Sequence, residues 1–391
     1  MNICFLSLEY PPETHVGGIG TYTYNMASAM AKLGHTVHVV TSSKYSDATV
    51  HENGVRVHRI KRLNVKPLEI AHFMYSFAIA KKISKIDCQF DIVQSSEYAS
   101  EAFWFSLNKR SPLITRLATP FFLVEELNGK KFFGPRPFFN YMERTQTLNS
   151  DGIFSSTKAL AQVVTSKWGI DPSRVSVIPN SIDVSRVKQL GKNRLAPDIL
   201  NKINFLLYFG RLEERKGVCI LAKALSDVFE RFPSIHMVFV GSDLEYKEAS
   251  MKEYIIEQSN KHKDRLLFFD NLPHEELFPI VNLSKLVILP SIWEAFGFVC
   301  IEAMALGRPV IASSGSGFEE IIEDEISGFL VAPGDSSLLA QKIISCLSNE
   351  EKLHLISKGA QKRAEDFEVS KVALKLLVYY KKYKRDFKTT F

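Results

Sequence analysis

Short runs of β-branched and aromatic residues alternate with longer amphipathic stretches along most of the chain. This alternation is typical of β-α-β units, which build parallel sheets. We therefore predict an α/β fold. In the first half, the expected strands are 2–8, 36–41, 55–60, 91–94, 112–117, 151–155 and 175–178, and the expected helices are 18–33, 69–86, 136–149 and 157–168.

The alternation weakens once, in a polar segment with Gly191 and Pro197, and then restarts at Ile203. This predicts a Rossmann-like N-terminal domain over 1–185, a linker over 186–202 and a second Rossmann-like domain over 203–369. Because open parallel sheets bind ligands at the carboxyl ends of their strands, we expect a central cleft between the domains to hold the site. The second domain should contain strands 203–209, 235–240, 265–269, 286–290, 309–313 and 329–332, and helices 217–231, 245–262, 298–306, 335–348 and 350–366.

A last amphipathic segment, about 370–386, has no strand after it. Its apolar face must therefore dock on a part of the molecule that is already built.

Composition adds limits rather than a function. The chain has 391 residues, 46% apolar and 24% charged, as in average globular proteins, and its five cysteines are scattered without metal-ligand spacing. Residues 1–185 hold 20 Lys and Arg against 15 Asp and Glu, and the rest holds 29 against 28. The excess of basic residues in 1–185 has two interpretations: an anionic partner of the N-terminal domain, such as membrane headgroups, or a solvated surface with a chance excess of charge. We expect a cytoplasmic protein, with peripheral contact to the inner face of the membrane as an option, and no nucleic-acid partner.

A glycine-rich turn follows the first strand and precedes a helix, with Gly17, Gly18 and Gly20. The free amides and the dipole of a helix N-terminus make such a turn a natural anion site. As a dinucleotide fingerprint the turn fails, because Thr23 stands where the third glycine belongs. The turn thus favours phosphate binding and argues against an NAD-dependent dehydrogenase.

A basic loop follows the strand at 203–209 and contains Gly210, Arg211 and Lys216. An arginine offers a planar fork and a lysine a compact charge, so the two suit the two phosphates of a diphosphate. A basic loop by itself is more often part of the solvated surface. Here, the other candidate residues of the same domain support a binding role for it.

Two glutamates frame the next candidate segment. Glu294 lies in the loop after the strand at 286–290, and Glu302 lies inside the following helix in an otherwise apolar stretch. About 12 Å of helix rise would separate them, so both can flank one nucleotide-sized ligand. The amides of Phe298 and Val299 at the helix start suit a phosphate, and carboxylates accept hydrogen bonds from vicinal diols.

At this point the chain resembles a known family. Gly210-Arg211…Lys216-Gly217 and Pro290-Ser291…Glu294-x-Phe296-Gly297…Glu302-Ala303-Met304 resemble the family 4 retaining glycosyltransferases of the GT-B fold. The resemblance covers nearly the whole chain, and it implies that the last segment, 370–391, crosses back and packs on the N-terminal domain. It implies an enzyme of two Rossmann-like lobes that moves a sugar from a UDP- or GDP-sugar to a hydroxyl of a glycan, lipid-linked or small-molecule acceptor, in cell-surface polysaccharide or glycoconjugate synthesis.

The resemblance also implies residue roles. Arg211, Lys216 and Glu294 would be catalytic: the cations stabilise the leaving diphosphate and the carboxylate holds the donor sugar. No cofactor and no metal are implied, since the cations replace the metal. Glu302 would bind the ribose, and Asn271 and Leu272 would touch the base. Donor contacts are further implied for Gly17, Gly18, Gly210, Gly297, Phe298 and Val299.

The acceptor side is less defined. Many relatives carry a histidine at the position of Ala118, where it touches the donor sugar. His15, Glu97 and Arg116 are candidates for this side. The aromatic and basic stretch over 121–139 is a candidate for acceptor recognition or membrane contact. The alanine leaves open a catalytically impaired nucleotide-sugar-binding module as an alternative to the transferase. Another enzyme of the same fold, such as an epimerase, is a second alternative.

Overall fold

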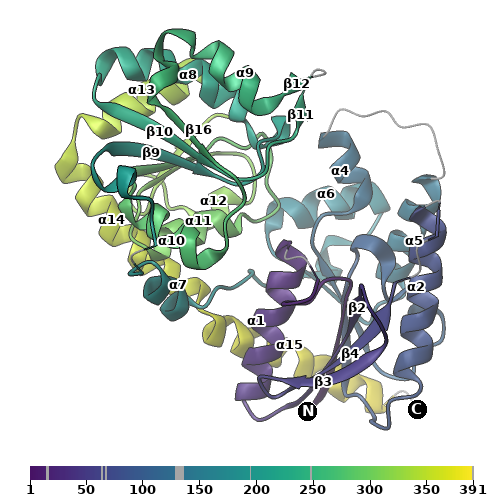
Figure 1. The fold of residues 1–391 in the computed structure, drawn as a ribbon. Helices are drawn as coiled ribbons and strands as arrows, with labels where there is room; N and C mark the ends of the chain where they lie inside the picture. The colour runs from purple at the N-terminus through teal and green to yellow at the C-terminus, as the bar shows by residue number, and fades with distance from the viewer. Residues whose placement is uncertain are drawn as a thin grey trace. The chain divides into compact units, whose positions relative to one another are not determined.

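The computed structural model describes residues 1–14, 17–62, 65–66, 68–127, 136–193, 195–246 and 249–389, and Figure 1 shows them as a ribbon. The chain forms two compact units. The first consists of Met1–Ser181 with Val369–Phe391, and the second of Ile182–Glu368. Each unit is built around a mainly parallel sheet covered by helices, so the α/β prediction with two Rossmann-like lobes is confirmed.

The first unit contains an eight-stranded sheet among its described residues, in the order β3-β4-β2-β1-β5-β6-β7-β8. All neighbouring strands run parallel except β3 and β4. The strand β3 was not predicted, because it is a short edge strand, largely exposed, without the buried apolar run that marks the others. The strands are β1 Asn2–Ser7, β2 Thr36–Ser43, β3 Ala48–Glu52, β4 Val55–Lys61, β5 Ile92–Ser96, β6 Leu113–Leu117, β7 Gly152–Ser155 and β8 Val175–Val177.

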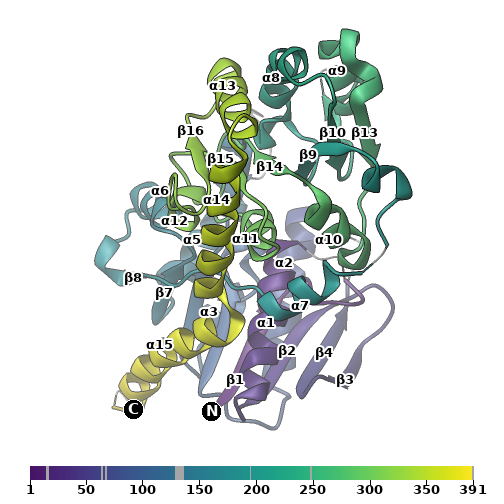
Figure 2. The same cartoon turned by 90° about the vertical axis from the view of Figure 1, so that its left-hand side faces the viewer.

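The helices of this unit are α1 Gly18–Lys32, α2 Leu68–Ile83, α3 Phe103–Leu107, α4 Phe121–Leu127, α5 Arg136–Leu148, α6 Lys158–Trp168 and the final α15 Val369–Thr389. Figures 1 and 2 show α15 beside α1. Tyr379 of α15 donates a hydrogen bond to the carbonyl oxygen of Ile153 in β7 (2.8 Å), and Tyr380 donates one to Gln94 in β5. The expected docking of the last helix on the N-terminal domain is confirmed.

The second unit contains a six-stranded parallel sheet in the order β13-β10-β9-β14-β15-β16. In β9, Phe205 and Leu207 pack into one apolar cluster and Leu206 and Tyr208 into another, on opposite faces. Successive side chains of a strand alternate between faces, so a strand covered on both sides is apolar throughout. The strands are β9 Asn204–Phe209, β10 Ile235–Val240, β13 Leu266–Phe269, β14 Leu286–Leu289, β15 Val310–Ser313 and β16 Phe329–Val331.

Helices cover both faces of this sheet, and Figure 2 shows α8 and α13 on the same side. The cluster on that side is built largely from α8 and α13, and the opposite cluster from α7, α10, α11 and α14. The helices are α7 Val184–Leu190, α8 Val218–Arg231, α9 Met251–Gln258, α10 His274–Leu283, α11 Phe298–Ala305, α12 Phe318–Ile321, α13 Ser336–Leu347 and α14 Glu350–Ala364.

Several further segments differ from the expectation, among them three of the second unit. The predicted helix over 245–262 is shorter: the hairpin strands β11 (Glu245–Tyr246) and β12 (Ala249–Ser250) precede α9, because Ser250 and Glu253 form a capping box that starts the helix at Met251. The segment 186–202, expected as a linker, belongs to the second unit and includes most of α7. The helix α10 was not predicted, and it contains Pro279.

Candidate active site

The predicted donor residues of the second unit gather at one edge of its sheet. The loop with Gly210, Arg211 and Lys216 follows β9, Asn271 and Leu272 follow β13, and the loop with Glu294 follows β14. All three strands run parallel, so their carboxyl ends lie at the same edge. This is the edge at which sheets of this class bind ligands.

Glycines allow the ends of β9 and β10 to approach each other. Gly210 has φ +140° and Gly241 has φ +148°, and a Cβ atom on Gly241 would overlap the carbonyl oxygen of Gly210. The amide of Gly210 donates to the carbonyl oxygen of Val240 (2.9 Å). The close approach fixes where the basic loop leaves the sheet. Gly241 was not selected from the sequence, although it ends a strand just as Gly210 does.

A glutamate positions the two arginines of the basic loop. The Glu213 carboxylate lies 3.0 Å from the Arg211 guanidinium and 2.7 Å from that of Arg215. The Arg211 side chain remains 57% exposed, whereas that of Arg215 is largely buried. Glu213 therefore orients the guanidinium of Arg211, which remains accessible to a ligand. Glu213 was not selected from the sequence, where its only signal is its place between the two cations.

Lys216 and Glu294 form an ion pair that joins the loop after β9 to the loop after β14. Both side chains are mostly buried, at 18% and 13% exposure. Burial opposes ionisation of Glu294, but the charges of Lys216 and Arg215 outweigh it, so the pKa of Glu294 lies below its ordinary value. The Lys216 ammonium carries three N–H donors, so it can keep Glu294 while donating to a phosphate.

The backbone around this ion pair is closely packed. Gly217 has φ +71°, and a Cβ atom there would overlap the carbonyl oxygen of Pro290. The amide of Ile292 donates to the carbonyl oxygen of Arg215, and that of Gly317 donates to the carbonyl oxygen of Glu294, both at 2.9 Å. The two loops are therefore joined by a backbone hydrogen bond as well as by charge, and the amide of Gly317 ties the loop after β14 to the segment after β15.

The helix α11 begins beside Glu294 and presents its first amides there. Gly297 caps it with φ +98°, where a Cβ atom would overlap the ring of Phe318. The first amides of a helix have no intrahelical acceptor, so those of Phe298 and Val299 can receive an anion. Both residues are partly exposed. The positive end of the helix dipole adds to the charges of Arg211 and Lys216.

Glu302 lies one turn further along α11 and is buried. Burial raises the pKa of its carboxyl, and the charge of His274 lowers it. His274 stands at the start of α10 and stacks on Phe278, with ring centroids 4.6 Å apart. Among the base-contact candidates, Asn271 is exposed and Leu272 packs against the core. His274 was not selected from the sequence, where it is one histidine among ten.

In the first unit, the glycine turn already has an anionic neighbour. Gly18 starts α1, and the amide of Gly17 donates to the carboxylate of Glu9 at 2.8 Å. A phosphate that used this amide would have to displace Glu9. His15, a predicted acceptor-side residue, lies outside the described residues.

Glu97 and Arg116, expected on the acceptor side, are brought together but are buried. The Glu97 carboxylate accepts from the amide of Ala118 at 2.7 and 2.8 Å, and burial raises its pKa to about 7 although Arg116 lowers it. The Arg116 guanidinium lies over the ring of Tyr22, 4.1 Å from its centroid, and donates to Asn180 at 3.1 Å. Glu97 thus holds the loop after β6 in place, Arg116 is held by Tyr22 and Asn180, and neither side chain presents its charge at the surface.

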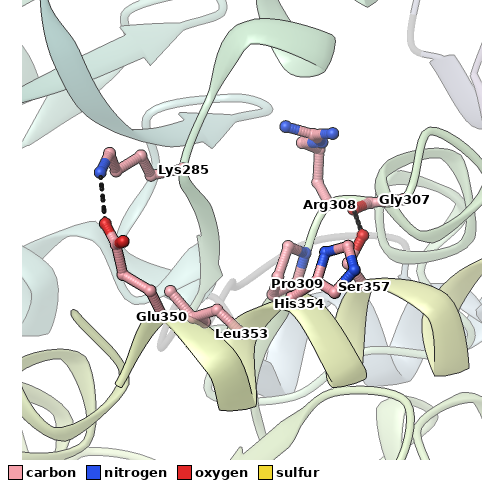
Figure 3. A pocket seen from close by; sticks show the side chains of 8 residues that line it. All are labelled: Lys285, Gly307, Arg308, Pro309, Glu350, Leu353, His354 and Ser357. Carbon is pink, nitrogen blue, oxygen red and sulfur yellow. Dashed lines mark hydrogen bonds and ion pairs between the residues drawn. The ribbon is translucent and has the colours of Figure 1, made fainter. Parts of the chain in front are cut away.

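A depression of about 260 Å³ lies elsewhere in the second unit, lined by Lys285, Arg308, Pro309, His354 and neighbouring residues of α14. Lys285 and Pro309 directly precede β14 and β15, so this depression is at the opposite edge of the sheet from Glu294. Figure 3 shows Lys285 paired with Glu350 and Ser357 donating to the carbonyl oxygen of Gly307. The candidate donor residues do not line it.

Comparison with known proteins places this geometry in a family. The model of Glycosyltransferase Family 4 matches residues 16–186, and that of Glycosyl transferases group 1 matches residues 192–363. The glycogen synthase of Mycobacterium tuberculosis is 26% identical over 399 residues, which cover 95% of this chain and 92% of the relative.

Two solved structures share the fold. Sucrose-phosphate synthase from Thermosynechococcus elongatus superposes with a TM-score of 0.76 at 20% identity, over 97% of this chain and 98% of that one. HepE of Anabaena in complex with UDP-glucose superposes with a TM-score of 0.72 at 20% identity, over 98% of this chain and 100% of that one. Two consecutive family matches on two parallel-sheet units show that the chain belongs to the family 4 glycosyltransferases of the GT-B fold.

Proposed function

We propose that this glycosyltransferase moves a sugar from a UDP- or GDP-sugar to a hydroxyl of a glycan, lipid-linked or small-molecule acceptor, with retention of configuration and without a metal. The observation that carries the proposal is the meeting of Lys216 with Glu294 beside Arg211 and the start of α11. A nucleoside diphosphate sugar needs a cationic site for the diphosphate and a carboxylate for sugar hydroxyls, side by side. UDP-glucose is the first donor to test, because the HepE structure contains it.

In this proposal, Arg211 and Lys216 bind the diphosphate and stabilise the negative charge that develops as it departs. The amides of Gly297, Phe298 and Val299 donate to the same phosphates. All of these donors belong to the second unit, and Glu213, Glu294 and backbone hydrogen bonds hold them in place before a ligand arrives. Preorganised charge of this kind is the largest contribution in many enzymes that stabilise a leaving group.

The two glutamates take different parts of the donor. Glu294, ionised beside Lys216, accepts hydrogen bonds from hydroxyls of the sugar. Glu302 accepts from the ribose, while Gly210, Asn271 and Leu272 line the nucleotide end. Gly17 and Gly18 are proposed to contact the diphosphate after Glu9 has released the Gly17 amide. The proposed product is an intermediate or end product of cell-surface polysaccharide or glycoconjugate synthesis.

Calorimetric titration with UDP, GDP and ADP tests the donor site, followed by assays of hydrolysis and transfer with the matching sugars in the presence of EDTA. We expect one nucleotide to bind and Arg211→Ala and Glu302→Ala to weaken it at least tenfold, an effect of about 1.4 kcal/mol or more. Lys285→Ala, at the opposite edge of the sheet, is the matched control. Binding without any turnover would identify a nucleotide-sugar-binding module, and absence of binding to all three nucleotides would refute the donor site.

A further inference from the structure

The outer face of three helices of the first unit is apolar. Ile70, Met74 and Phe77 form a stripe along α2, spaced by four and three residues, and all three are exposed. Leu107 at the end of α3 and Phe138 and Tyr141 of α5 extend it. We name these six residues the α2–α5 face. At 54% for Phe77 and 58% for Tyr141, more than half of these two aromatic side chains is in contact with solvent.

Aromatic contacts make the α2–α5 face continuous. The ring of Phe73 lies 5.0 Å from that of Trp104 and 5.6 Å from that of Phe138, and Phe77 lies 5.6 Å from Trp104. The helices α2, α3 and α5 also contact one another, and Figure 1 shows α2 and α5 side by side. The exposed side chains thus rest on a packed aromatic layer and form one surface, instead of being scattered singly.

The face is not needed to build the core of the unit. The opposite side of α2 supplies Tyr75, Ile79 and Ile83 to the apolar cluster under the sheet. A helix that is apolar on both sides is usually covered on both. Here one side is left to the solvent, which indicates a partner that covers it.

The charge of the unit indicates the chemistry of that partner. In the first unit, residues 1–181 carry 20 Lys and Arg against 14 Asp and Glu, a net +6, and residues 369–391, which lie outside the face, carry 7 against 1, a further +6. The second unit carries 22 against 28, a net −6. Exposed lysines border the face: Lys81 continues the stripe of α2, and Lys85 follows at the end of that helix. Arg110, also exposed, comes shortly after Leu107. An apolar surface with a basic border matches an anionic lipid surface.

No helix among the described residues is long and apolar enough to cross a bilayer. We propose that the α2–α5 face rests on the surface of a membrane that contains anionic lipid, with its apolar side chains at the level of the headgroups and its lysines against lipid phosphates. Tyr141 is suited to this depth, because its ring is apolar and its hydroxyl can stay in the hydrated headgroup layer. The proposal concerns binding alone and does not depend on the donor or acceptor of the enzyme.

Sedimentation of the full chain with vesicles tests it, using phosphatidylcholine alone and phosphatidylcholine with phosphatidylglycerol. We expect binding to the anionic vesicles, reduced by salt. The double variant Met74→Ser, Phe77→Ser should weaken it by about tenfold or more, because both side chains lose the apolar area that they would bury. Since both residues are exposed, this variant should keep its circular dichroism spectrum.

The matched control is Leu374→Ser, Val378→Ser on α15, whose side chains are 54% and 70% exposed in the same unit but outside the face. It should bind the vesicles as the original chain does. Equal loss in both double variants, or no binding to either vesicle, would overturn the proposal. So would self-association of the original chain that Met74→Ser, Phe77→Ser abolishes, because the face would then belong to a second copy of the chain.

Discussion

Replacing Lys216 by methionine removes the cation that Glu294 faces and keeps most of the length and apolar stem of the side chain. The pair is 18% and 13% exposed, so water compensates little for the loss. Breaking a buried ion pair by removing one partner commonly costs about 3–5 kcal/mol. Because Arg215 also stabilises the charge of Glu294, we expect a loss of about 3 kcal/mol in the free energy of unfolding at pH 7.

The loss should depend on pH. In the original chain the pKa of Glu294 lies below its ordinary value of 4.5, so its ionisation contributes stability that is present above about pH 4.5 and lost as pH falls through the folded pKa. In Lys216→Met, burial should raise the pKa of Glu294, and protonation then relieves the destabilisation as pH falls. The difference between the two proteins should therefore shrink from pH 7 towards pH 4.5.

Urea unfolding followed by circular dichroism measures this, analysed with a separate transition for the second unit. The variants Glu294→Gln and Lys216→Met, Glu294→Gln complete a double-mutant cycle, in which we expect a coupling energy of about 2 kcal/mol. A loss below about 0.5 kcal/mol in Lys216→Met, or a loss that is the same at both pH values, would refute the reasoning. Additive single effects would likewise show that the two side chains do not interact.

Two further predictions concern the backbone and a buried acid. Gly217→Ala should lower the melting temperature much more than Gly169→Ala, because both residues have positive φ (71° and 66°) but only Gly217 has no room for a Cβ atom; equal effects would contradict this. Glu101 is buried, which raises the pKa of its carboxyl to about 8, so its contribution to stability is present below about pH 4.5 and is lost as pH rises through 8. Glu101→Gln should reduce the fall in the free energy of unfolding between pH 5 and pH 8.5, as measured by urea unfolding at both pH values. A fall as large as in the original chain would contradict this.

Much of the fold follows from the sequence because the signals are local. The apolar run of β9 predicts a strand covered on both faces, and the structure places one apolar cluster on each side of it. The spacing of Val372, Leu376 and Tyr380 in α15 likewise predicts an apolar stripe that must be covered, and all three are buried. Segments without such a signal were missed: β3 is an exposed edge strand, and α10 contains a proline.

One part of the candidate site can be predicted from the sequence, and another part cannot. The order of strand, loop and helix brings Arg211, Lys216 and Glu294 to one edge of the sheet, and it can be read along the chain. Only the tertiary structure decides that Lys216 pairs with Glu294. It also decides that Glu213 holds Arg211, a contact within one loop whose geometry depends on how that loop leaves the sheet.

The first unit shows most clearly where prediction from the sequence ends. Glu97 was expected near an acceptor because it follows the end of a strand, and Arg116 was a candidate for the same side; both are buried, and Glu97 accepts from the Ala118 amide. A sequence pattern tells which residues share a strand end or a helix face, because these periodicities are set by the backbone. Whether a polar side chain there meets solvent, a ligand or another part of the chain depends on segments far away in sequence, and packing decides it.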